Sequence, residues 1–347
     1  MNSQNRTMRA AVWYSNSDIR IEEQPLRSPG EHEMLVKVMA CGICGSDVVE
    51  WYRLPRAPLV QGHELGAKVV ELGPAVTGYT PGDRVFIAPK VACLECDYCR
   101  GGHYPQCTTI KERLPGAFAE YVLVPETLVS LGTRLLPDAI SYEHATFIEP
   151  LACVVRSQHI AGLATGRNVL ILGCGMSGLL QVQLAKNRGC RVAATDIDPA
   201  KLDRASSLGA DLVLPANGDV PQQVEQYFGK KADAVILCTG ALPAVEQAWA
   251  TVDKGGAVVF FAVPGPDKSV TFPVNTFWTS EIRILTSYYC GPPDIDESIR
   301  LLAGGEIEVA SLITHRLPLV DSAEGFRLVL EGKEAIKVII EPHGKPA

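Results

Sequence analysis

Four cysteines in one short segment have the spacing of a metal site. Cys93, Cys96, Cys99 and Cys107 follow the pattern C-x2-C-x2-C-x7-C within the stretch CLECDYCRGGHYPQC. Four thiolates complete a tetrahedral shell around Zn²⁺ and leave no position open, as in structural rather than catalytic sites. The glycine and polar residues around them predict a loop, which a metal would order. The alternative is four unrelated cysteines, and we favour the structural zinc site.

A second set of possible metal ligands is dispersed along the chain. Cys44 lies in CGICGSD, His63 and Glu64 lie in QGHELG, and Glu149 lies in FIEPLA. Each is close to glycine or proline, where the chain turns, as residues that converge on one site often are. Taken singly, they also fit a buried thiol, a hydrogen-bonded core histidine and surface carboxylates. Together they are enough for a catalytic zinc that keeps one position for water or substrate.

A glycine-rich turn in the middle of the chain has the features of a dinucleotide site. The apolar run at 169–172 precedes a helical pattern, and the turn between them reads Gly173-Cys174-Gly175-Met176-Ser177-Gly178. Gly173 permits the tight turn, Gly175 lets a diphosphate approach the backbone, and Gly178 lets helix and strand pack closely. The anion then lies at the helix N-terminus. An ordinary strand-to-helix turn is the alternative, but the flanking elements favour dinucleotide binding.

The acid that ends the next apolar run indicates which dinucleotide binds. Asp196 stands at the distance expected of a carboxylate that binds the two ribose hydroxyls of an adenosine. It would repel a 2'-phosphate, and the following Ile197 and Asp198 supply no arginine to accept one. We therefore expect NAD rather than NADP, with Asp196 and Ile197 among the cofactor-binding residues. Lys201 and Arg204 lie close enough to weaken this preference.

Two kinds of periodicity divide the chain. Residues 1–155 hold short β-like runs between turn residues, which predicts a mostly β domain. Between 156 and 295 strands alternate with helices, and six candidate strands predict an α/β, doubly wound parallel sheet. From 296 to 347 we expect two helices and two strands that complete the first domain.

Composition limits the class of protein. Of 347 residues, 47% are hydrophobic and 20% are charged, which fits a soluble globular protein with two cores. No apolar run is long enough to span a membrane and the polar start MNSQNRTMRA has no signal-peptide core, so we expect a cytoplasmic protein without a membrane partner. The net charge of −7 and the absence of a basic stripe argue against nucleic acid as a partner, and against a nucleic-acid-binding zinc ribbon. The eleven cysteines fit metal ligation or burial better than disulfides in such a chain.

These motifs resemble those of the zinc-dependent medium-chain dehydrogenases, and most of all the polyol dehydrogenases of the sorbitol and threonine dehydrogenase type. The resemblance covers nearly the whole chain and rests on CGICGSD, GHELG, PGDRV, the four-cysteine segment, IEPL, the glycine turn, Cys238-Thr239-Gly240 and Thr314-His315-Arg316. It implies a GroES-like catalytic domain, a Rossmann domain, a cleft between them, and a homodimer or homotetramer. It also adds Cys238, Thr239 and Gly240 to the cofactor-binding residues.

The resemblance assigns roles to the dispersed ligands. It makes Cys44 rather than Cys41 the thiolate ligand and His63 the imidazole ligand, because the family's cysteine stands directly before Gly-Ser-Asp. Glu64 and Glu149 are then the carboxylates that bind the catalytic zinc or its water. Together with the four-cysteine site, this implies two zinc ions per chain.

The implied reaction is oxidation of a secondary alcohol to a ketone. Zinc lowers the pKa of the substrate hydroxyl, and a hydride leaves to the nicotinamide. The catalytic residues are Ser46, which takes the hydroxyl proton, together with Glu64 and Glu149. Relatives commonly carry a proton-relay histidine three residues after that serine, where this chain has Val49. The proton then leaves through the nicotinamide ribose and water, or through another group such as Glu50 or Glu64.

The substrate is a small-molecule alcohol whose identity the motifs leave open. Two glutamates near the zinc suit a vicinal diol or an amino alcohol better than an apolar alcohol. Residues 50–56 either line the active site, where Arg53 or Arg56 could hold a carboxylate or phosphate, or form a solvated loop. Tyr288 and Tyr289 stand where sorbitol dehydrogenases carry a substrate-contacting arginine, which disfavours sorbitol itself.

Two other functions fit the same motifs. A reductase that acts on a ketone or a sugar derivative would use the same residues and differ only in the cellular cofactor ratio. A non-catalytic NAD-binding relative would keep the fold and lose the zinc chemistry. The retention of Ser46 and of the catalytic zinc ligands argues against that second alternative, whereas Val49 keeps it open.

Overall fold

The computed structural model describes residues 6–110 and 112–344, which form two units. Unit 1 comprises the described residues up to Pro150, Gly291–Gly305 and those from Val309 on, and unit 2 comprises Leu151–Cys290 and Glu306–Glu308. The divisions at Pro150 and Gly291 differ slightly from the predicted ones at 155 and 295. Helix α4 (Ile148–Ala161) continues through the first division, so no turn in the sequence marks it.

The strands of unit 1 form two sheets. The larger has the order β15-β16-β3-β5-β6-β8, with β7 also paired to β3, and the smaller has the order β2-β1-β4. Their bounds are β1 (Thr7–Ser15), β2 (Asp18–Pro25), β3 (Met34–Gly42), β4 (Leu59–Val60), β5 (Glu64–Leu72), β6 (Arg84–Ile87), β7 (Tyr121–Val124), β8 (Thr133–Leu135), β15 (Ile313–Pro318) and β16 (Lys337–Glu341). The sequence did not predict β2, because its residues DIRIEEQP are mostly polar and none of them is buried.

The C-terminal strands belong to the larger sheet of unit 1. Strand β16 pairs antiparallel with β3, where Ile339 lies opposite Gly42, and parallel with β15. All five residues of β16 are buried. The helices of unit 1 are η2 (Gly45–Val48), α1 (Glu50–Arg53), η3 (Leu54–Arg56), α2 (Asp97–Arg100), η4 (Tyr104–Gln106), η5 (Leu128–Gly132), α3 (Tyr142–Ala145), α10 (Pro292–Ala303), η6 (Ala310–Leu312), η7 (Leu319–Asp321) and α11 (Ser322–Glu331).

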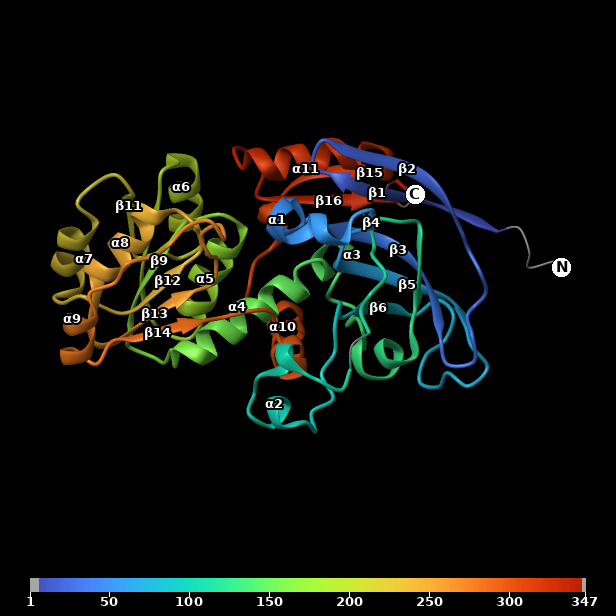
Figure 1. The fold of residues 1–347 in the computed structure, drawn as a ribbon, viewed down its shortest axis with the longest axis horizontal. Helices are drawn as coiled ribbons and strands as arrows, with labels where there is room; N and C mark the ends of the chain where they lie inside the picture. Colours follow the sequence, from blue (N-terminus) through green and yellow to red (C-terminus); the bar gives the residue numbers. More distant parts are fainter. Residues whose placement is uncertain (1–5, 111, 345–347) are drawn as a thin grey trace. The chain divides into compact units, whose positions relative to one another are not determined.

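Unit 2 is a six-stranded parallel sheet with helices around it (Figure 1). The strand order is β11-β10-β9-β12-β13-β14, and every neighbouring pair is parallel, which confirms the predicted doubly wound sheet. The strands are β9 (Asn168–Leu172), β10 (Arg191–Asp196), β11 (Leu212–Pro215), β12 (Ala232–Leu237), β13 (Val252–Phe260) and β14 (Arg283–Thr286). The helices are α5 (Met176–Asn187), α6 (Pro199–Ser207), α7 (Val220–Phe228), α8 (Leu242–Thr251) and α9 (Val274–Thr279).

Strand β9 lies at the centre of this sheet, and all of its residues are buried. A strand covered on both faces reads as a continuous apolar run, which is the pattern that the sequence shows at 169–172. None of the helices in residues 6–110 and 112–344 is long and apolar enough to cross a membrane.

Candidate active site and metal centres

The register of two antiparallel strands brings Cys44 and His63 together. In the β3–β5 pair, Gly42 lies opposite Glu64. Cys44 follows the end of β3 and His63 directly precedes β5, so both lie at the same end of the sheet. The Cys44 sulfur, one His63 ring nitrogen and one Glu64 carboxylate oxygen all lie within 4.8 Å of one another.

The state of Glu64 shows that this group fits a cation. Its side chain is fully buried, and Oε2 accepts a hydrogen bond from the ammonium group of Lys337, which is also fully buried. Oε1 is buried and has no hydrogen-bond partner among the described residues. An unpaired buried oxygen of this kind costs about 1–3 kcal/mol, and a metal ion would remove that cost. A thiolate, an imidazole and a carboxylate form a donor set suited to Zn²⁺ with an open position.

Asp47 orients His63, although the sequence did not single it out. Its buried carboxylate accepts hydrogen bonds from the Cys44 N–H at 3.1 Å and from Arg53 Nη2 at 2.8 Å, and lies 3.4 Å from His63 Nδ1. This leaves the other ring nitrogen of His63 for a metal and fixes the ring's orientation. Burial opposes the charge on Asp47, but the positive charges of His63 and Arg53 outweigh it and lower the pKa of the carboxyl group. Its place beside Ser46 in the CGSD motif was the available signal.

Two donors of this group hold their protons more tightly than usual. Burial raises the pKa of the Cys44 thiol, and the negative charge of Glu64 raises it further. Burial also disfavours a charged His63, but Asp47 outweighs this and holds the pKa of His63 well above its ordinary value. Zinc binds a thiolate and a neutral imidazole, so loading the site releases protons.

Ser46 lies on the same turn as Cys44. Its backbone N–H donates to the Cys44 sulfur at 3.4 Å, and its hydroxyl accepts from Arg53 Nη2 at 2.9 Å. The two glutamates considered for proton transfer are both engaged. The Glu50 carboxylate accepts from the Asn16 N–H at 2.9 Å, and Glu64 is paired with a lysine, as described above.

Lys337 is a second residue that the sequence did not reveal as part of the site. Its Nζ lies 5.1 Å from the ring centroid of Phe147, in addition to its ion pair with Glu64. A Cβ atom at Gly42 would lie 2.5 Å from Lys337 Nζ and 2.6 Å from Glu64 Oε2, so glycine makes room for the pair. The available signal was a lysine next to the apolar residues of β16.

Glu149 is not part of the three-donor group. It lies in the first turn of α4 and is buried, with 5% of its surface exposed. Its carboxylate is not among the donors that lie within 4.8 Å of both Cys44 and His63. A role of Glu149 at the zinc therefore stays a proposal.

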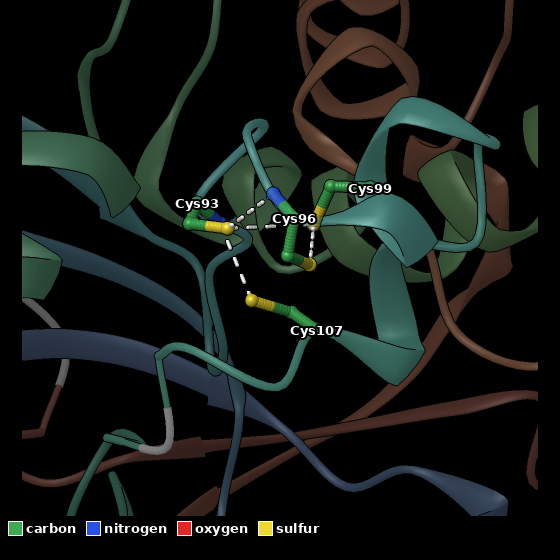
Figure 2. A group of neighbouring side chains, drawn as sticks. All are labelled: Cys93, Cys96, Cys99 and Cys107. Atoms are coloured by element: carbon green, nitrogen blue, oxygen red, sulfur yellow. Dashed lines mark hydrogen bonds between the residues drawn. The ribbon is translucent and has the colours of Figure 1, made fainter.

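The four cysteines of the short segment converge on one point in unit 1 (Figure 2). The sulfur of Cys99 lies 3.8 Å from that of Cys93 and 3.4 Å from that of Cys96, and all four sulfurs lie within 4.8 Å of one another. Sulfurs bound at about 2.3 Å in a tetrahedron would be about 3.8 Å apart, so the group fits Zn²⁺. Backbone N–H groups also donate to the sulfurs of Cys93 and Cys107.

The thiols of this group differ in acidity. A hydrogen bond from Thr109 and backbone N–H groups of Cys96 and Glu95 lower the pKa of Cys93 to about 6. Burial raises the pKa of Cys99 to about 12. The lowered pKa of Cys93 favours the thiolate form that zinc binds, whereas the raised pKa of Cys99 opposes it.

The glycine turn joins β9 to α5 in unit 2. Gly173 has φ +98°, in the left-handed region that favours glycine. A Cβ atom at Gly178 would lie 1.9 Å from the carbonyl oxygen of Gly173, so no residue with a side chain fits between helix and strand there. A Cβ atom at Gly175, the N-cap of α5, would meet no atom within 4 Å. The space beside Gly175 is where a diphosphate would approach the backbone.

This turn lies where the strand order of the sheet reverses. The chain leaves β9 for β10 on one side, while β12 lies on the other. The Asp196 carboxylate at the end of β10 accepts from the Cys174 N–H at 2.7 Å and from the Asp198 N–H at 3.0 Å. Cys238 follows β12, and its N–H donates to Leu172 in β9 at 2.8 Å. Asp196 and residues 238–240 therefore share the edge of the sheet at which open α/β folds bind ligands.

A mostly β unit with a three-donor metal group and a four-cysteine group, in one chain with a doubly wound unit, defines the class of zinc-binding alcohol dehydrogenases. Residues 30–133 match the model of the alcohol dehydrogenase GroES-like domain, and residues 178–304 match that of zinc-binding dehydrogenases. The chain belongs to the zinc-dependent medium-chain dehydrogenases and is sorbitol dehydrogenase-like.

Individual relatives match over nearly their full lengths. The chain is 31% identical to sorbitol dehydrogenase of Gallus gallus over 96% of each chain. It is 35% identical to D-arabitol-phosphate dehydrogenase of Enterococcus avium over 90% of each. The structure of a zinc-binding dehydrogenase from Sinorhizobium meliloti bound to NADP superposes with a TM-score of 0.87 at 30% identity, covering 97% of this chain and 100% of that one.

Proposed function

We propose that this chain is an NAD-dependent zinc dehydrogenase that oxidises a secondary alcohol of a polyol, or of a related polyhydroxylated or amino-alcohol substrate, to a ketone. The observation that carries the proposal is the group of Cys44, His63 and Glu64 on the turn where the Ser46 N–H donates to the Cys44 sulfur. The names of the relatives, a sorbitol and an arabitol-phosphate dehydrogenase, support a polyhydroxylated substrate.

Each residue of the site has a distinct task in this proposal. Cys44, His63 and Glu64 hold the catalytic zinc, with Glu149 as a further carboxylate for the metal or its water. A bound zinc supplies Lewis acidity that lowers the pKa of a substrate hydroxyl, and a bound nicotinamide accepts the hydride. Ser46 accepts the proton of the substrate hydroxyl at Oγ.

The preference for NAD rests on Asp196. Its carboxylate stands at the end of β10, beside the glycine turn, where it can accept hydrogen bonds from ribose hydroxyls and repel a 2'-phosphate. The neighbouring Ile197 is exposed and uncharged. The Sinorhizobium meliloti relative binds NADP, so the cofactor of this chain is a point for direct measurement.

We also propose a homodimer or homotetramer. Large apolar side chains are exposed on unit 2 in and near α9 and β14, an edge strand of the sheet. These side chains are Val263, Phe272, Val274, Trp278, Ile284 and Tyr288. A second copy of the chain would remove this apolar surface from water, which is favourable by about 25 cal/mol per Å².

The test is reduction of NAD by the metal-replete protein, followed at the nicotinamide absorbance. The alcohols are sorbitol, ribitol, erythritol, inositol, threonine, arabitol phosphate and simple secondary alcohols. We expect turnover with a polyol, loss of turnover on mild chelation, and little turnover with NADP. Replacing Ser46 with alanine should lower kcat by at least about 100-fold.

Zinc content separates the alternatives. About two zinc ions per chain together with turnover of a ketone plus NADH, but of no alcohol, would favour the reductase. About one zinc ion per chain, with NAD binding and no turnover in either direction, would favour the non-catalytic relative.

A further inference from the structure

Arg53 is built into the turn that carries Ser46. It is the last residue of α1, and 11% of its side chain is exposed. Its Nη2 donates to Ser46 Oγ at 2.9 Å and to Asp47 Oδ1 at 2.8 Å, and its Nε donates to the Ser46 carbonyl oxygen at 3.0 Å. Three of the five N–H donors of a guanidinium are thus committed to one turn.

These bonds leave little room for Arg53 to clamp a substrate anion. Bidentate binding of a carboxylate or phosphate uses two parallel N–H groups of the guanidinium. The fork formed by Nε and Nη2 already binds Ser46 and Asp47. The face of the guanidinium also lies over the Tyr52 ring, with 5.1 Å between Cζ and the ring centroid. Arg53 is therefore better suited to holding protein groups than to holding substrate.

The bond to Oγ determines how Ser46 can handle a proton. A serine hydroxyl has one proton to donate and two lone pairs to accept with. Arg53 donates to one lone pair of Ser46 Oγ. The other lone pair can accept from the substrate hydroxyl, and the proton of Ser46 can pass to another acceptor. A guanidinium cannot accept that proton, because it is already fully protonated in proteins. The residue at the relay-histidine position, Val49, cannot accept it either.

The second hydrogen bond of Nη2, to Asp47, connects Arg53 to the three-donor group. Asp47 is the carboxylate that faces His63 Nδ1 and accepts from the Cys44 N–H. Arg53 thus holds one oxygen of the residue that orients a zinc ligand. A single guanidinium ties the proton-accepting hydroxyl and the orienting carboxylate to one geometry.

We propose that Arg53 is a positioning residue for the dehydrogenation, which holds Ser46 Oγ and the Asp47 carboxylate in register with the zinc ligands and directs the proton away from itself toward solvent. This inference rests on the proposed function. The substrate O–H bond breaks and its proton passes to Ser46 Oγ, while the proton of Ser46 passes to water. A bound NAD would accept the hydride from the C–H bond of the substrate, and Arg53 keeps all its protons.

The test compares Arg53→Met, Arg53→Lys and a matched control, Arg20→Met. Arg20 is also paired with a nearby aspartate and also lies over a tyrosine ring, at 4.4 Å. It belongs to strand β2, which carries none of the proposed site residues. We expect Arg53→Met to lower kcat by about 10–100-fold with less than about threefold change in KM. Arg53→Lys should restore part of the loss, because an ammonium cannot reproduce the planar fork. Arg20→Met should match the wild type.

A double-mutant cycle shows whether Arg53 acts through Ser46. In the Ser46→Ala background, Arg53→Met should lower kcat by a smaller factor than in the wild type, because the hydroxyl that it positions is gone and only its effect through Asp47 remains. Losses that multiply in the double variant would contradict action through Ser46. A raised KM with an unchanged kcat would assign Arg53 to substrate binding instead and overturn the proposal.

Cobalt substitution gives a readout that needs no turnover. We expect the visible absorption of the cobalt-loaded Arg53→Met protein to differ from that of wild type and Arg20→Met, because Asp47 no longer holds His63 in one orientation. The four-cysteine group contributes equally to all three spectra. Identical spectra would overturn the proposal. If the wild type turns over no alcohol, the proposed function fails, while the spectra still decide whether Arg53 positions the turn.

Discussion

We propose that the choice between NAD and NADP depends on the carboxylate of Asp196. Asp196 accepts two backbone hydrogen bonds, from Cys174 and Asp198, and these hold its side chain at the end of β10. A carboxylate fixed in this way can accept from two ribose hydroxyls without losing much side-chain entropy. It also places a negative charge where NADP would carry its additional phosphate.

Replacing Asp196 with serine should therefore weaken NAD and relieve the repulsion of NADP. We expect kcat/KM for NAD to fall by about 10–150-fold, the equivalent of about 1.5–3 kcal/mol for hydrogen bonds to a charged group. The measurement is initial rates with each cofactor at saturating alcohol. Asp198→Ser is the control, because serine still caps α6. An unchanged NAD to NADP ratio in Asp196→Ser would contradict the assigned role.

The pKa values of individual ligands also differ between the three-donor group and the four-cysteine group. In the metal-free protein, His63 has a raised pKa and the Cys44 thiol has a raised pKa, so both hold protons that compete with zinc. In the four-cysteine group, the pKa of Cys93 is lowered to about 6 and that of Cys96 is also lowered, although burial raises that of Cys99, so two of its four ligands hold their protons less tightly than an ordinary thiol. Protons compete with zinc for a ligand at any pH below the pKa of that ligand, and the competition increases as the pH falls further.

Lowering the pH from about 8 to about 6 should therefore release the zinc held by Cys44 and His63 before that of the four-cysteine group. We expect activity and about one zinc ion per chain to be lost together, with the second ion retained. Dialysis at stepwise pH followed by metal analysis measures this. Simultaneous loss of both ions would show that the ligand pKa values do not control the order of release.

At the scale of elements, the two glycines Gly175 and Gly178 of the glycine turn differ in their surroundings. Gly178 provides the contact between helix and strand, since a Cβ there would lie 1.9 Å from the Gly173 carbonyl oxygen. Gly175 faces open space. Gly178 is thus required by the packing of the fold, and we propose that Gly175 is required by the cofactor.

Two alanine substitutions should separate these tasks. Gly178→Ala should reduce the free energy of unfolding by about 1–3 kcal/mol through overpacking, and should weaken NAD binding as well. Gly175→Ala should leave thermal unfolding unchanged and weaken NAD binding at least about tenfold, because the new methyl group occupies the approach of the diphosphate. Thermal unfolding and NAD titration by protein fluorescence give both quantities. Equal effects in the two variants would contradict the division.

The strand ends of β3, β5 and β16 bring Lys337 to Glu64, so that the three-donor group contains a buried ion pair. Lys337→Met would leave the Glu64 charge without its partner, which costs about 3–5 kcal/mol in a buried site. A bound zinc would compensate part of this charge. We expect the variant to be strongly destabilised when zinc is removed and less so when zinc is present, as measured by denaturant unfolding with and without chelator. The same loss in both states would show that Glu64 does not face the metal.

At the scale of the whole molecule, the exposed apolar surface near β14 predicts association. Trp278 is 79% exposed and Val274 is 59% exposed, both on α9. We expect the wild type to be a dimer or tetramer by light scattering and Val274→Glu/Trp278→Glu to shift it toward the monomer. Leu330→Glu, on α11 of unit 1, is a control with a similarly exposed leucine. A monomeric wild type would refute the oligomer.

The amino-acid sequence by itself determined the features that depend on neighbours along the chain. The buried strand, turn and helix around Gly173 are encoded in one continuous stretch, and so is the spacing of Cys93 to Cys107. Such features can be predicted without knowing the fold, because hydrophobic periodicity indicates the type of element and cysteine spacing indicates whether one loop can surround a metal. The residue types proposed Cys44 and His63 as ligands, and the resemblance then favoured Cys44 over Cys41.

Only the tertiary structure decided the partners that come from distant strands. Lys337 meets Glu64 because β16 pairs with β3 and β3 pairs with β5, and no local pattern encodes that register. The three bonds of Arg53 to the Ser46 turn span only seven residues, but they too depend on how α1 folds back on that turn. Side-chain contacts across elements follow from register and packing, which the sequence specifies only through the whole fold.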